Sequence, residues 1–550
     1  MLTKEQEAAV QHVYGPMMVV AGPGSGKTMV LTQRVKYLLA YTQPERILVI
    51  TFAKKAAEEM KKRFAAITNE HMANKVTFGT FHAVFYHWLR NWGVVPSDVQ
   101  VMEEEQKEKL WLELGWDMED VPAFLLCHRD EFMKYQEEKR KRKWIDFDDM
   151  MQLMEREIVR HDVSQEYEFF LIDEFQDINP QQYQIVKHMV GKGNANLFIV
   201  GDEDQAIYAF RGSAPELFLG FPEDFPNCRR IDLTVNFRSQ QRIVTAAGEL
   251  IQHNQARFDK VIRADKEKGE PVRVRSTFDD KQEARYIRDQ IIKHRYQGYR
   301  YNEMAILCRT NAQLKKIASA LQEGGVPFEC NESWKIGDKP EELLIRQDLE
   351  LFWRLCRDMT DREAFQRVLR VLPVLQKAGN WRRVEEGKSV FEGILEQKMD
   401  AEVRRETEEF WKKLRAGAKM TREKAFRYWL LQTDYLSYAY DKAKRRGLSK
   451  MAVWRQIWLM FAQKDREKVS LLTMHGAKGL EFDWVWICGM NEGEMPRKEA
   501  LEARTIEEER RLLYVAMTRA RRRLTLSYYD GLGAKPSSFL KEIKSLQSFL

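Results

Sequence analysis

Residues 21–28, AGPGSGKT, have the types and spacing of a loop that binds phosphate. An apolar run at residues 17–20 precedes them and apolar residues at helical spacing follow, which predicts a strand, a loop and a helix. Glycines let the backbone wrap around an anion, while the amides and the helix N-terminus supply partial positive charge. Lys27 can reach the outer phosphates, and Thr28 can ligate Mg²⁺. The predicted nucleotide-binding residues are Ala21, Gly22, Pro23, Gly24, Ser25, Gly26, Lys27 and Thr28, with Ala21 where the strict pattern has glycine.

A second segment supplies the carboxylates that such a site requires. Residues 167–177, YEFFLIDEFQD, contain an apolar run that ends in Asp173 and Glu174. Because Mg²⁺ prefers oxygen ligands, Asp173 is a candidate for the metal shell opposite Thr28. Glu174 is placed to orient or deprotonate a water molecule. The two acidic residues could also be no more than a helix cap, but beside a phosphate loop they favour an NTPase site.

The elements that position these residues belong to a chain of several domains. It has 550 residues, 44% hydrophobic and 31% charged, so it is too long for one core and too apolar for a disordered protein. The net charge of +7 permits a polyanionic partner but decides little. The six cysteines include no CxxC pair, which argues against zinc or iron–sulfur ligation and favours reduced thiols.

No apolar run in the sequence approaches the roughly 18 residues needed to span a bilayer. The amino terminus, MLTKEQEAAVQH, is charged from its fourth residue and does not resemble a secretory signal. We therefore expect a cytoplasmic protein without a membrane partner.

Nine short segments occur in a specific order along the chain. They are LTKEQEAAV (2–10), AGPGSGKT (21–28), TFAKKAAEEM (51–60), FGTFHA (78–83), LIDEFQD (171–177), VGDEDQAIYAFRGS (200–213), VNFRS (235–239), LLTMHGAKGLEF (471–482) and LLYVAMTRA (512–520). Together they resemble the ordered motifs of superfamily 1 DNA helicases of the UvrD, PcrA and Rep type. The resemblance covers both predicted motor domains and fades in two inserted stretches.

The resemblance implies an α/β protein with two RecA-like P-loop motor domains, each built on a parallel sheet and interrupted by a helical insertion. ATP would bind between the two domains. Gln6 would read the adenine edge, Phe237 would stack on its face, and Glu481 would hold the ribose. Arg238 and Arg519 would reach the γ-phosphate from the second domain and stabilise charge during phosphoryl transfer.

The loop at residues 201–213, GDEDQAIYAFRGS, changes from acidic to aromatic along its length. By the resemblance, Gln205 would sense the γ-phosphate while Tyr208, Phe210 and Arg211 face single-stranded DNA. A base stacked on an aromatic ring is worth roughly 1–3 kcal/mol, and separating a base-pair step costs about 1.4 kcal/mol. Because these energies are similar, making and breaking such stacks can shift a strand by about one base without trapping it.

Other motif residues extend the predicted DNA path. Phe52, His82 and His475 lie in motifs that line this path in relatives. Relatives commonly have tryptophan where Phe210 stands, so the smaller ring predicts a weaker grip on a base.

The motifs and the hydrophobic periodicity predict four parts. These are a first motor domain (1–87 plus 145–228), a helical insertion (88–144), a second motor domain (229–335 plus 467–550) and a helical accessory insertion (336–466). In the second motor domain strands alternate with helices, as in the strand-like 271–278 and 304–311, each followed by a helical segment, 279–294 and 312–321.

The two insertions have different features. The first ends in a basic run, residues 139–143, which is either a solvated helix end or a contact to duplex phosphates. The accessory insertion has aromatic residues at helical spacing in 425–446 and 451–463. The acidic stretch at 146–149 is assigned no metal.

We therefore expect an ATP- and Mg²⁺-dependent single-stranded DNA translocase and DNA helicase, with 3′-to-5′ travel implied by the resemblance. Its substrates would be single-stranded DNA and single-strand/duplex junctions, and repair, replication or nuclease proteins are candidate partners of a monomer or weak dimer. Two alternatives stay open, the motor subunit of a nuclease complex and a nucleotide-gated factor that binds DNA or displaces proteins without unwinding. An inactive ATPase is disfavoured because the chain keeps Lys27, Asp173, Glu174, Gln205, Arg238 and Arg519.

Overall fold

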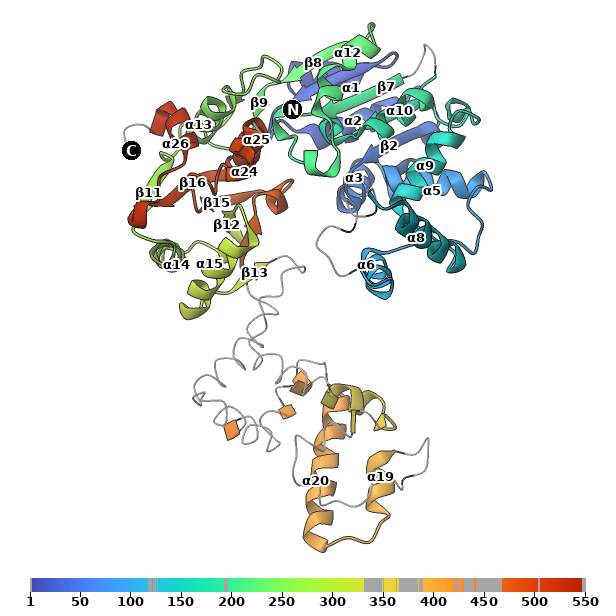
Figure 1. The fold of residues 1–550 in the computed structure, drawn as a ribbon, viewed down its shortest axis with the longest axis vertical. Helices are drawn as coiled ribbons and strands as arrows, with labels where there is room; N and C mark the ends of the chain where they lie inside the picture. Colours follow the sequence, from blue (N-terminus) through green and yellow to red (C-terminus); the bar gives the residue numbers. More distant parts are fainter. Residues whose placement is uncertain are drawn as a thin grey trace. The chain divides into compact units, whose positions relative to one another are not determined.

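The structure is a computed structural model of the whole chain, drawn as a ribbon in Figure 1. It describes residues 2–116, 121, 125, 127–191, 196–330, 349, 351–362, 364–365, 384, 389–420, 424–426, 428–429, 440–441, 467–502 and 505–546. The chain divides into two compact units, Met1–Ala320 with Ser470–Leu550, and Leu321–Val469.

The first sheet has six parallel strands in the order β3-β2-β6-β7-β1-β8. Its strands are β1 (Met17–Ala21), β2 (Ile47–Thr51), β3 (Thr77–Thr80), β6 (Phe169–Ile172), β7 (Asn196–Gly201) and β8 (Arg229–Leu233). Side chains of β1 alternate between two cores, with Val19 in one and Val20 in the other. Both faces of the sheet are therefore buried, which explains why these strands are continuous apolar runs.

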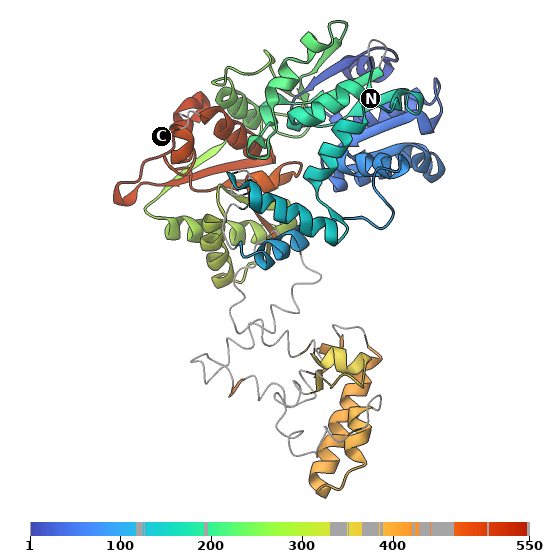
Figure 2. The same ribbon diagram turned by 45° about the vertical axis from the view of Figure 1, so that its right-hand side comes forward.

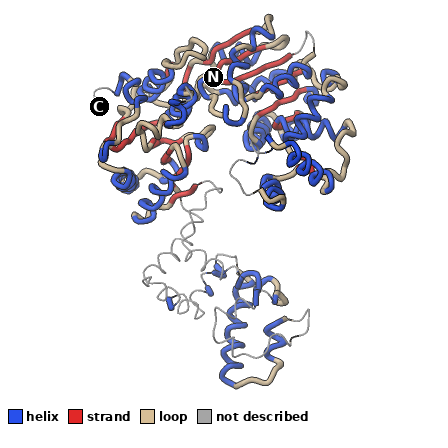
Figure 3. Tube along the Cα trace, in the orientation of Figure 1, coloured by secondary structure: helices blue, strands red, loops and turns tan. Residues whose placement is uncertain are grey.

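Helices cover both faces of this sheet (Figure 1; Figure 3). One core contains side chains of α1 (Lys4–Gln11), α2 (Lys27–Leu38), α3 (Lys54–Ile67) and α4 (Glu70–Lys75). The other contains side chains of α5 (Phe81–Asn91), α9 (Phe147–Glu157), α10 (Pro180–Met189), α11 (Pro215–Leu219) and α12 (Phe221–Asp224).

The first sheet extends beyond the domain boundary that the sequence predicts at residue 228. Strand β8 pairs with β1 in parallel register, from Met17 opposite Arg229 to Ala21 opposite Leu233. Residues 229–233 therefore belong to the first sheet, because the edge of β1 that faces away from β7 is completed by β8.

The second sheet has the order β11-β16-β15-β12-β14-β13. Its strands are β11 (Arg273–Thr277), β12 (Met304–Cys308), β13 (Phe328–Cys330), β14 (Val469–Thr473), β15 (Phe482–Ile487) and β16 (Ala520–Tyr529). Helices pack against this sheet (Figure 2). Helices α13 (Gln241–Ile251), α14 (Asp280–Tyr296) and α25 (Ile506–Met517) contact its strands, and α26 (Ser538–Glu542) shares its core. Helix α24 (Lys498–Glu502) contacts α25, and α15 (Asn311–Glu323) follows β12 in the chain. The predicted α/β class and the predicted strand–helix alternation are confirmed.

The larger unit also contains two sheets of two short strands each. Strands β9 (Val235–Asn236) and β10 (Arg263–Ala264) pair beside the phosphate loop. Strands β4 (Gln100–Val101) and β5 (Trp144–Ile145) pair in the first insertion, which also contains α6 (Glu104–Glu113) and α8 (Arg129–Lys141).

Most of the basic side chains at residues 139–143 form ion pairs. Lys139 is buried, and its ammonium lies 2.7 Å from a carboxylate oxygen of Asp146 and 2.6 Å from one of Asp149. Lys141, Arg142 and Lys143 pair with Glu138, Glu113 and Asp98. Of the two alternatives for this run, the solvated helix end does not hold for Lys139, whose buried ammonium is bound by two acidic residues at the start of α9.

The smaller unit has its own apolar core around Trp429. Helices α19 (Val390–Leu395) and α20 (Ala401–Ala418) contribute to this core. Gly417 lets the Trp429 ring approach α20, because a Cβ at this position would lie 2.5 Å from the ring. The predicted helix at 451–463 and most of 425–446 lie outside the described residues. No helix in the described part of the chain has the length and apolarity to cross a membrane.

Candidate functional site

The phosphate loop between β1 and α2 has the geometry of an anion site. Gly24 (φ +66°) and Gly26 (φ +83°) adopt the left-handed region that favours glycine. A Cβ at Gly24 would lie 2.6 Å from the Cβ of Arg238, so only glycine allows this approach. Helix α2 begins at Lys27 without a capping side chain, which leaves its first amide groups to an anion.

The carboxylates after β6 lie beside this loop. The Lys27 ammonium is 3.4 Å from Glu174 Oε2, to which Gln176 Nε2 donates at 2.6 Å. Burial and the charge of Glu174 raise the pKa of Asp173, whose Oδ1 is buried without a hydrogen-bond partner among the described residues. Burial opposes ionisation of Glu174, but the charges of Lys27 and Lys478 outweigh it and lower its pKa. A cation beside Asp173 would offset both the burial of its charge and the repulsion from Glu174.

The segment VNFRS is seated directly on the phosphate loop. Asn236 Nδ2 donates to Pro23 O at 2.7 Å, and the Phe237 amide donates to Gly24 O at 3.0 Å. From the other side, Gln6 Nε2 donates to Ser25 O at 2.9 Å. The structure thus brings together nucleotide-binding candidates that are more than 200 residues apart in the sequence.

Glu481 lies between two arginines. Arg238 Nε donates to its Oε2 at 2.5 Å, and Arg521 binds its Oε1. Burial opposes ionisation, but the Arg521 hydrogen bond and the Arg238 charge lower the pKa of Glu481 to about 2. The residue that the resemblance assigns to ribose binding is, in this structure, the anionic partner of both arginines.

Arg519 carries a buried charge with neutral partners. It is 2% exposed, and its guanidinium donates to Val515 O at 2.9 Å, Leu480 O at 3.3 Å and Gln205 Oε1 at 3.1 Å. Among the described residues no carboxylate forms a salt bridge with it. Burial and the charge of Arg238 lower the pKa of Arg519 to about 9. A buried guanidinium in this condition is suited to an anionic ligand.

Gln205 occupies the junction between the two sheets. Its Nε2 donates to Asp202 Oδ2 at 2.6 Å, while its Oε1 accepts from Arg519. Its main-chain oxygen accepts from Lys478 Nζ at 2.9 Å, and the same ammonium donates to Asp177 Oδ2 at 2.5 Å. Lys478 therefore connects the strand end that carries the predicted catalytic carboxylates with the Gln205 loop.

The aromatic half of the loop continues these contacts. The Lys478 ammonium lies 4.7 Å from the centroid of the Tyr208 ring. The Tyr208 and Phe210 centroids are 6.0 Å apart, and the His475 ring meets Phe210 edge-on at 5.5 Å. Phe210 is 65% exposed. Consecutive contacts thus lead from the Gln205 main chain through Lys478 and Tyr208 to an exposed ring.

Sequence comparisons identify the family of the chain. The UvrD/REP helicase N-terminal domain model matches residues 2–119 and 128–226, and the UvrD-like helicase C-terminal domain model matches residues 231–457 and 448–531. The chain belongs to the UvrD-like helicase family. The ATP-dependent DNA helicase PcrA of Staphylococcus epidermidis is 29% identical, over 98% of this chain and 86% of PcrA. The ATP-dependent DNA helicase Rep of Salmonella typhimurium is 27% identical, over 98% of this chain and 94% of Rep.

In this UvrD-like helicase, two other residues that are predicted to line the DNA path lie against phenylalanine rings. Phe52 packs edge-on against Phe81 at 5.5 Å, and His82 lies 4.4 Å from the Phe147 ring. The Arg211 side chain lies outside what the structure describes. Their assignment to the DNA path therefore stays a prediction.

Two features of the candidate site in this UvrD-like helicase are absent from the sequence-based prediction. Lys478 lies within the segment LLTMHGAKGLEF, and a lysine amid small and apolar residues was the available signal. The buried acidic residues Asp202, Glu203 and Asp204 pair with Arg257 and Lys260. No spacing rule links the 202–204 segment to the 257–260 segment, because the two meet only in the fold.

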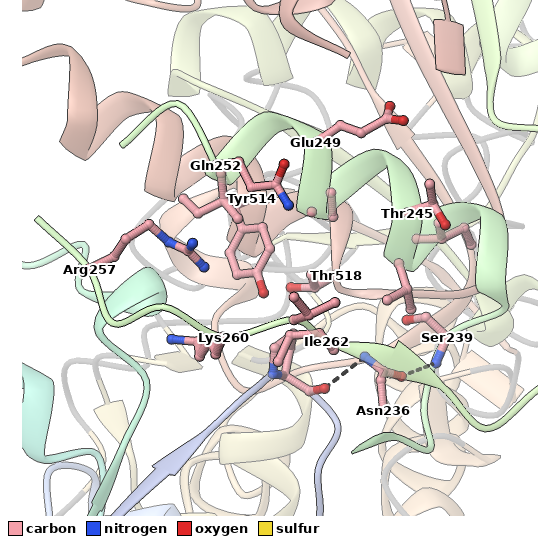
Figure 4. Close-up of a pocket in the computed structure, with 17 residues that line it drawn as sticks. Asn236, Ser239, Thr245, Glu249, Gln252, Arg257, Lys260, Ile262, Tyr514 and Thr518 are labelled. Atoms are coloured by element: carbon pink, nitrogen blue, oxygen red, sulfur yellow. Dashed lines mark hydrogen bonds between the residues drawn. The ribbon is translucent and has the colours of Figure 1, made fainter. Parts of the chain in front are cut away.

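A cavity of about 200 Å³ lies behind the phosphate loop (Figure 4). Pro23 and Asn236 line it together with residues of α13 and with Tyr514 and Thr518. Lys27, Glu174 and Arg519 do not line it. The cavity is therefore a neighbour of the nucleotide-binding candidates and not the nucleotide site itself.

Proposed function

We propose that the protein is an ATP- and Mg²⁺-dependent single-stranded DNA translocase and DNA helicase that travels 3′ to 5′. Its relatives bear the names of ATP-dependent DNA helicases. The observation that carries the proposal is the series of contacts from Gln205 through Lys478 to Tyr208 and Phe210. This series gives nucleotide binding a physical route to an exposed aromatic platform.

The nucleotide would bind on the phosphate loop with its γ-phosphate facing Arg238, Arg519 and Gln205. Lys27 and the first amides of α2 would bind the phosphates, and the buried Arg519 charge would be neutralised by them. Glu174 would orient or deprotonate the attacking water. Gln6, Phe237 and Glu481 would contact the nucleoside, with Glu481 exchanging part of its arginine contacts for the ribose.

Asp173 and Thr28 would hold Mg²⁺. The buried Oδ1 of Asp173 has no hydrogen-bond partner among the described residues, so the donor set fits the ion. The ion would neutralise charge on the β- and γ-phosphate oxygens.

Hydrolysis would be coupled to movement because the proposed phosphate-binding residues contact the loop that carries Phe210. The γ-phosphate would contact Gln205 and Arg519, which already share a hydrogen bond, and would change how the Gln205 loop is held. Lys478 would pass this change to Tyr208 and Phe210, so that the stack between a base and Phe210 is made in one nucleotide state and released in another. Stacking energies of roughly 1–3 kcal/mol per base are small enough for one hydrolysis event to make and break them.

We propose the four-part division predicted from the sequence, with the first motor domain extended to residue 233 because β8 completes its sheet. The substrates would be single-stranded DNA and single-strand/duplex junctions, and the protein would act in the cytoplasm as a monomer or weak dimer.

The proposal is tested with purified protein and defined DNA. ATP hydrolysis should rise steeply with single-stranded DNA and require Mg²⁺. Fluorescent duplexes with a tail at either end should be unwound from the 3′ tail when ATP is present. Equal hydrolysis with and without DNA would remove the motor function, whereas DNA-stimulated hydrolysis without unwinding would leave only the translocase.

Phe210→Ala should weaken binding of single-stranded DNA by about 1–3 kcal/mol, because one stacking surface is lost. Phe210→Trp should bind more tightly than the parent, since its ring is larger. Fluorescence anisotropy with a labelled oligonucleotide measures both. Tyr296→Ala is the matched control, because Tyr296 is also an exposed aromatic residue but lies on α14. Unchanged affinity in Phe210→Ala would contradict the stacking role.

Lys478→Met should reduce the stimulation of ATP hydrolysis by single-stranded DNA at least about 5-fold, the lower end of usual coupling energies. The substitution removes the ammonium that joins Asp177, the Gln205 main chain and the Tyr208 ring. Asp177→Asn keeps two of these three contacts and should retain more stimulation. The measurement is the ratio of turnover with and without DNA, and a ratio equal to that of the parent would remove Lys478 from the route.

A further inference from the structure

A buried ion cluster joins the acidic half of the 201–213 loop to a segment after α13. The side chains of Asp202, Glu203 and Asp204 are fully buried. The Lys260 ammonium lies 3.0 Å from Asp202 Oδ1 and 3.1 Å from Asp204 Oδ2, and it also bonds Glu203. Arg257 binds both carboxylate oxygens of Asp204, at 2.8 and 3.0 Å. Two of the protein's own cations therefore face three acidic side chains, and burial raises the pKa of Glu203.

Arg257 and Lys260 follow residues that are hydrogen-bonded to α25. Asn254 Nδ2 donates to Glu507 O at 3.0 Å, and the Gln255 amide donates to Glu507 Oε1 at 2.8 Å. These bonds hold the segment that presents Arg257 and Lys260, which lie beside Tyr514 of α25 in Figure 4. The cluster thus connects the loop after β7 with the helix that leads to Arg519.

Asp202 transmits this contact to Gln205. One carboxylate oxygen, Oδ1, accepts from Lys260, and the other, Oδ2, accepts from Gln205 Nε2 at 2.6 Å. Arg519 donates to the Gln205 Oε1. The amide of Gln205 is therefore oriented, with its nitrogen toward Asp202 and its oxygen toward Arg519. An amide nitrogen carries two donors, so one remains for a phosphate oxygen.

We propose that Lys260 is a positioning residue for Gln205, holding the Asp202 carboxylate so that the Gln205 amide faces the γ-phosphate. The proposal rests on the proposed function, in which Gln205 contacts that phosphate. Without the ammonium, Asp202 is a buried carboxylate that must turn, protonate or take water. Each of these changes releases the Gln205 amide from its present orientation.

If Lys260 orients Gln205, its loss should change the ratio between the affinities for a triphosphate analogue and for ADP. The test variant is Lys260→Met with Glu203→Gln in the full chain, which removes one carboxylate charge together with the ammonium. The matched control is Arg257→Met with Glu203→Gln, which removes a cation that touches Asp204 and not Asp202. Calorimetry gives the affinities for ADP and for the non-hydrolysable analogue with a β,γ-imido bridge, and thermal melting gives the stability of each variant.

The Lys260 variant should lose at least about 5-fold of the ratio between analogue and ADP affinity, with the ADP affinity unchanged. The Arg257 control should keep the ratio despite a similar loss in melting temperature. In a Gln205→Ala background, which itself lowers the ratio, the Lys260 substitutions should reduce it no further. A purely structural role would lower both affinities together.

Two results would overturn the inference. If Gln205→Ala lowers the ratio but the Lys260 variant keeps it, Lys260 does not position Gln205 and the proposed function stands. If Gln205→Ala itself keeps the ratio, the γ-phosphate contact in the proposed function fails first. Should the Lys260 variant not fold, Asp202→Asn removes the charge that Lys260 holds and should lower the ratio equally; a parental ratio in that variant would also reject the inference.

Discussion

Lys27→Ala should lower ATP turnover at least about 10³-fold, at the scale expected when a main cationic contact to a transferring phosphoryl group is removed. The Lys27 side chain is 12% exposed and lies 3.4 Å from Glu174. Its loss would remove the positive charge that we propose binds the outer phosphates, and it leaves Glu174 without that partner. Steady-state hydrolysis at saturating single-stranded DNA is the measurement.

The same variant should keep its affinity for single-stranded DNA when no nucleotide is added. Phe210 and His475, which are proposed to contact the DNA, pack against each other, whereas Lys27 pairs with Glu174. Lys36→Ala is the matched control, since Lys36 is an exposed lysine in the last turn of the same helix. Turnover of Lys27→Ala within about tenfold of the parent would be incompatible with a phosphate-binding role for this loop, given the losses that such contacts normally cause.

Much of the first motor domain could be predicted from local sequence. The run FFLIDE gives a buried strand followed by carboxylates, and AGPGSGKT gives the loop and the start of α2, because glycine and apolar patterns act over a few residues. The boundary after residue 228 could not be predicted in this way. Whether β8 pairs with β1 or begins a new sheet is decided by long-range pairing, and its sequence, RRIDL, is compatible with both.

The candidate site shows the same division. Arg238, Glu481 and Arg519 are found from motif order, but motif order does not show which of them is paired with another side chain. Glu481 is held by two arginines, whereas Arg519 is buried among neutral acceptors. Lys260 belongs to none of the recognised motifs, and its role depends on carboxylates that lie more than 50 residues earlier in the chain.

Arg519→Met should lower turnover by about 10³-fold, the lower end of the range for arginines that stabilise charge on a transferring phosphoryl group. Methionine fills much of the same buried volume without the charge. Arg522→Met is the matched control, because Arg522 is three residues away and its side chain is 62% exposed. Single-turnover hydrolysis at saturating ATP and DNA separates the chemical step from binding, and turnover within about tenfold of the parent would contradict the role.

The stability of Arg519→Met distinguishes a catalytic charge from a structural one. Among the described residues the guanidinium forms no salt bridge, and burial and the charge of Arg238 lower its pKa to about 9. Methionine removes the cost of burying a charge without a salt-bridge partner, but it leaves Val515 O, Leu480 O and Gln205 Oε1 without this donor. These effects oppose each other, so the free energy of unfolding should fall by no more than about 1–3 kcal/mol while turnover is lost. A large fall in both quantities would instead make Arg519 a structural residue, and the charge stabilising the γ-phosphate would have to come from Arg238 and Lys27.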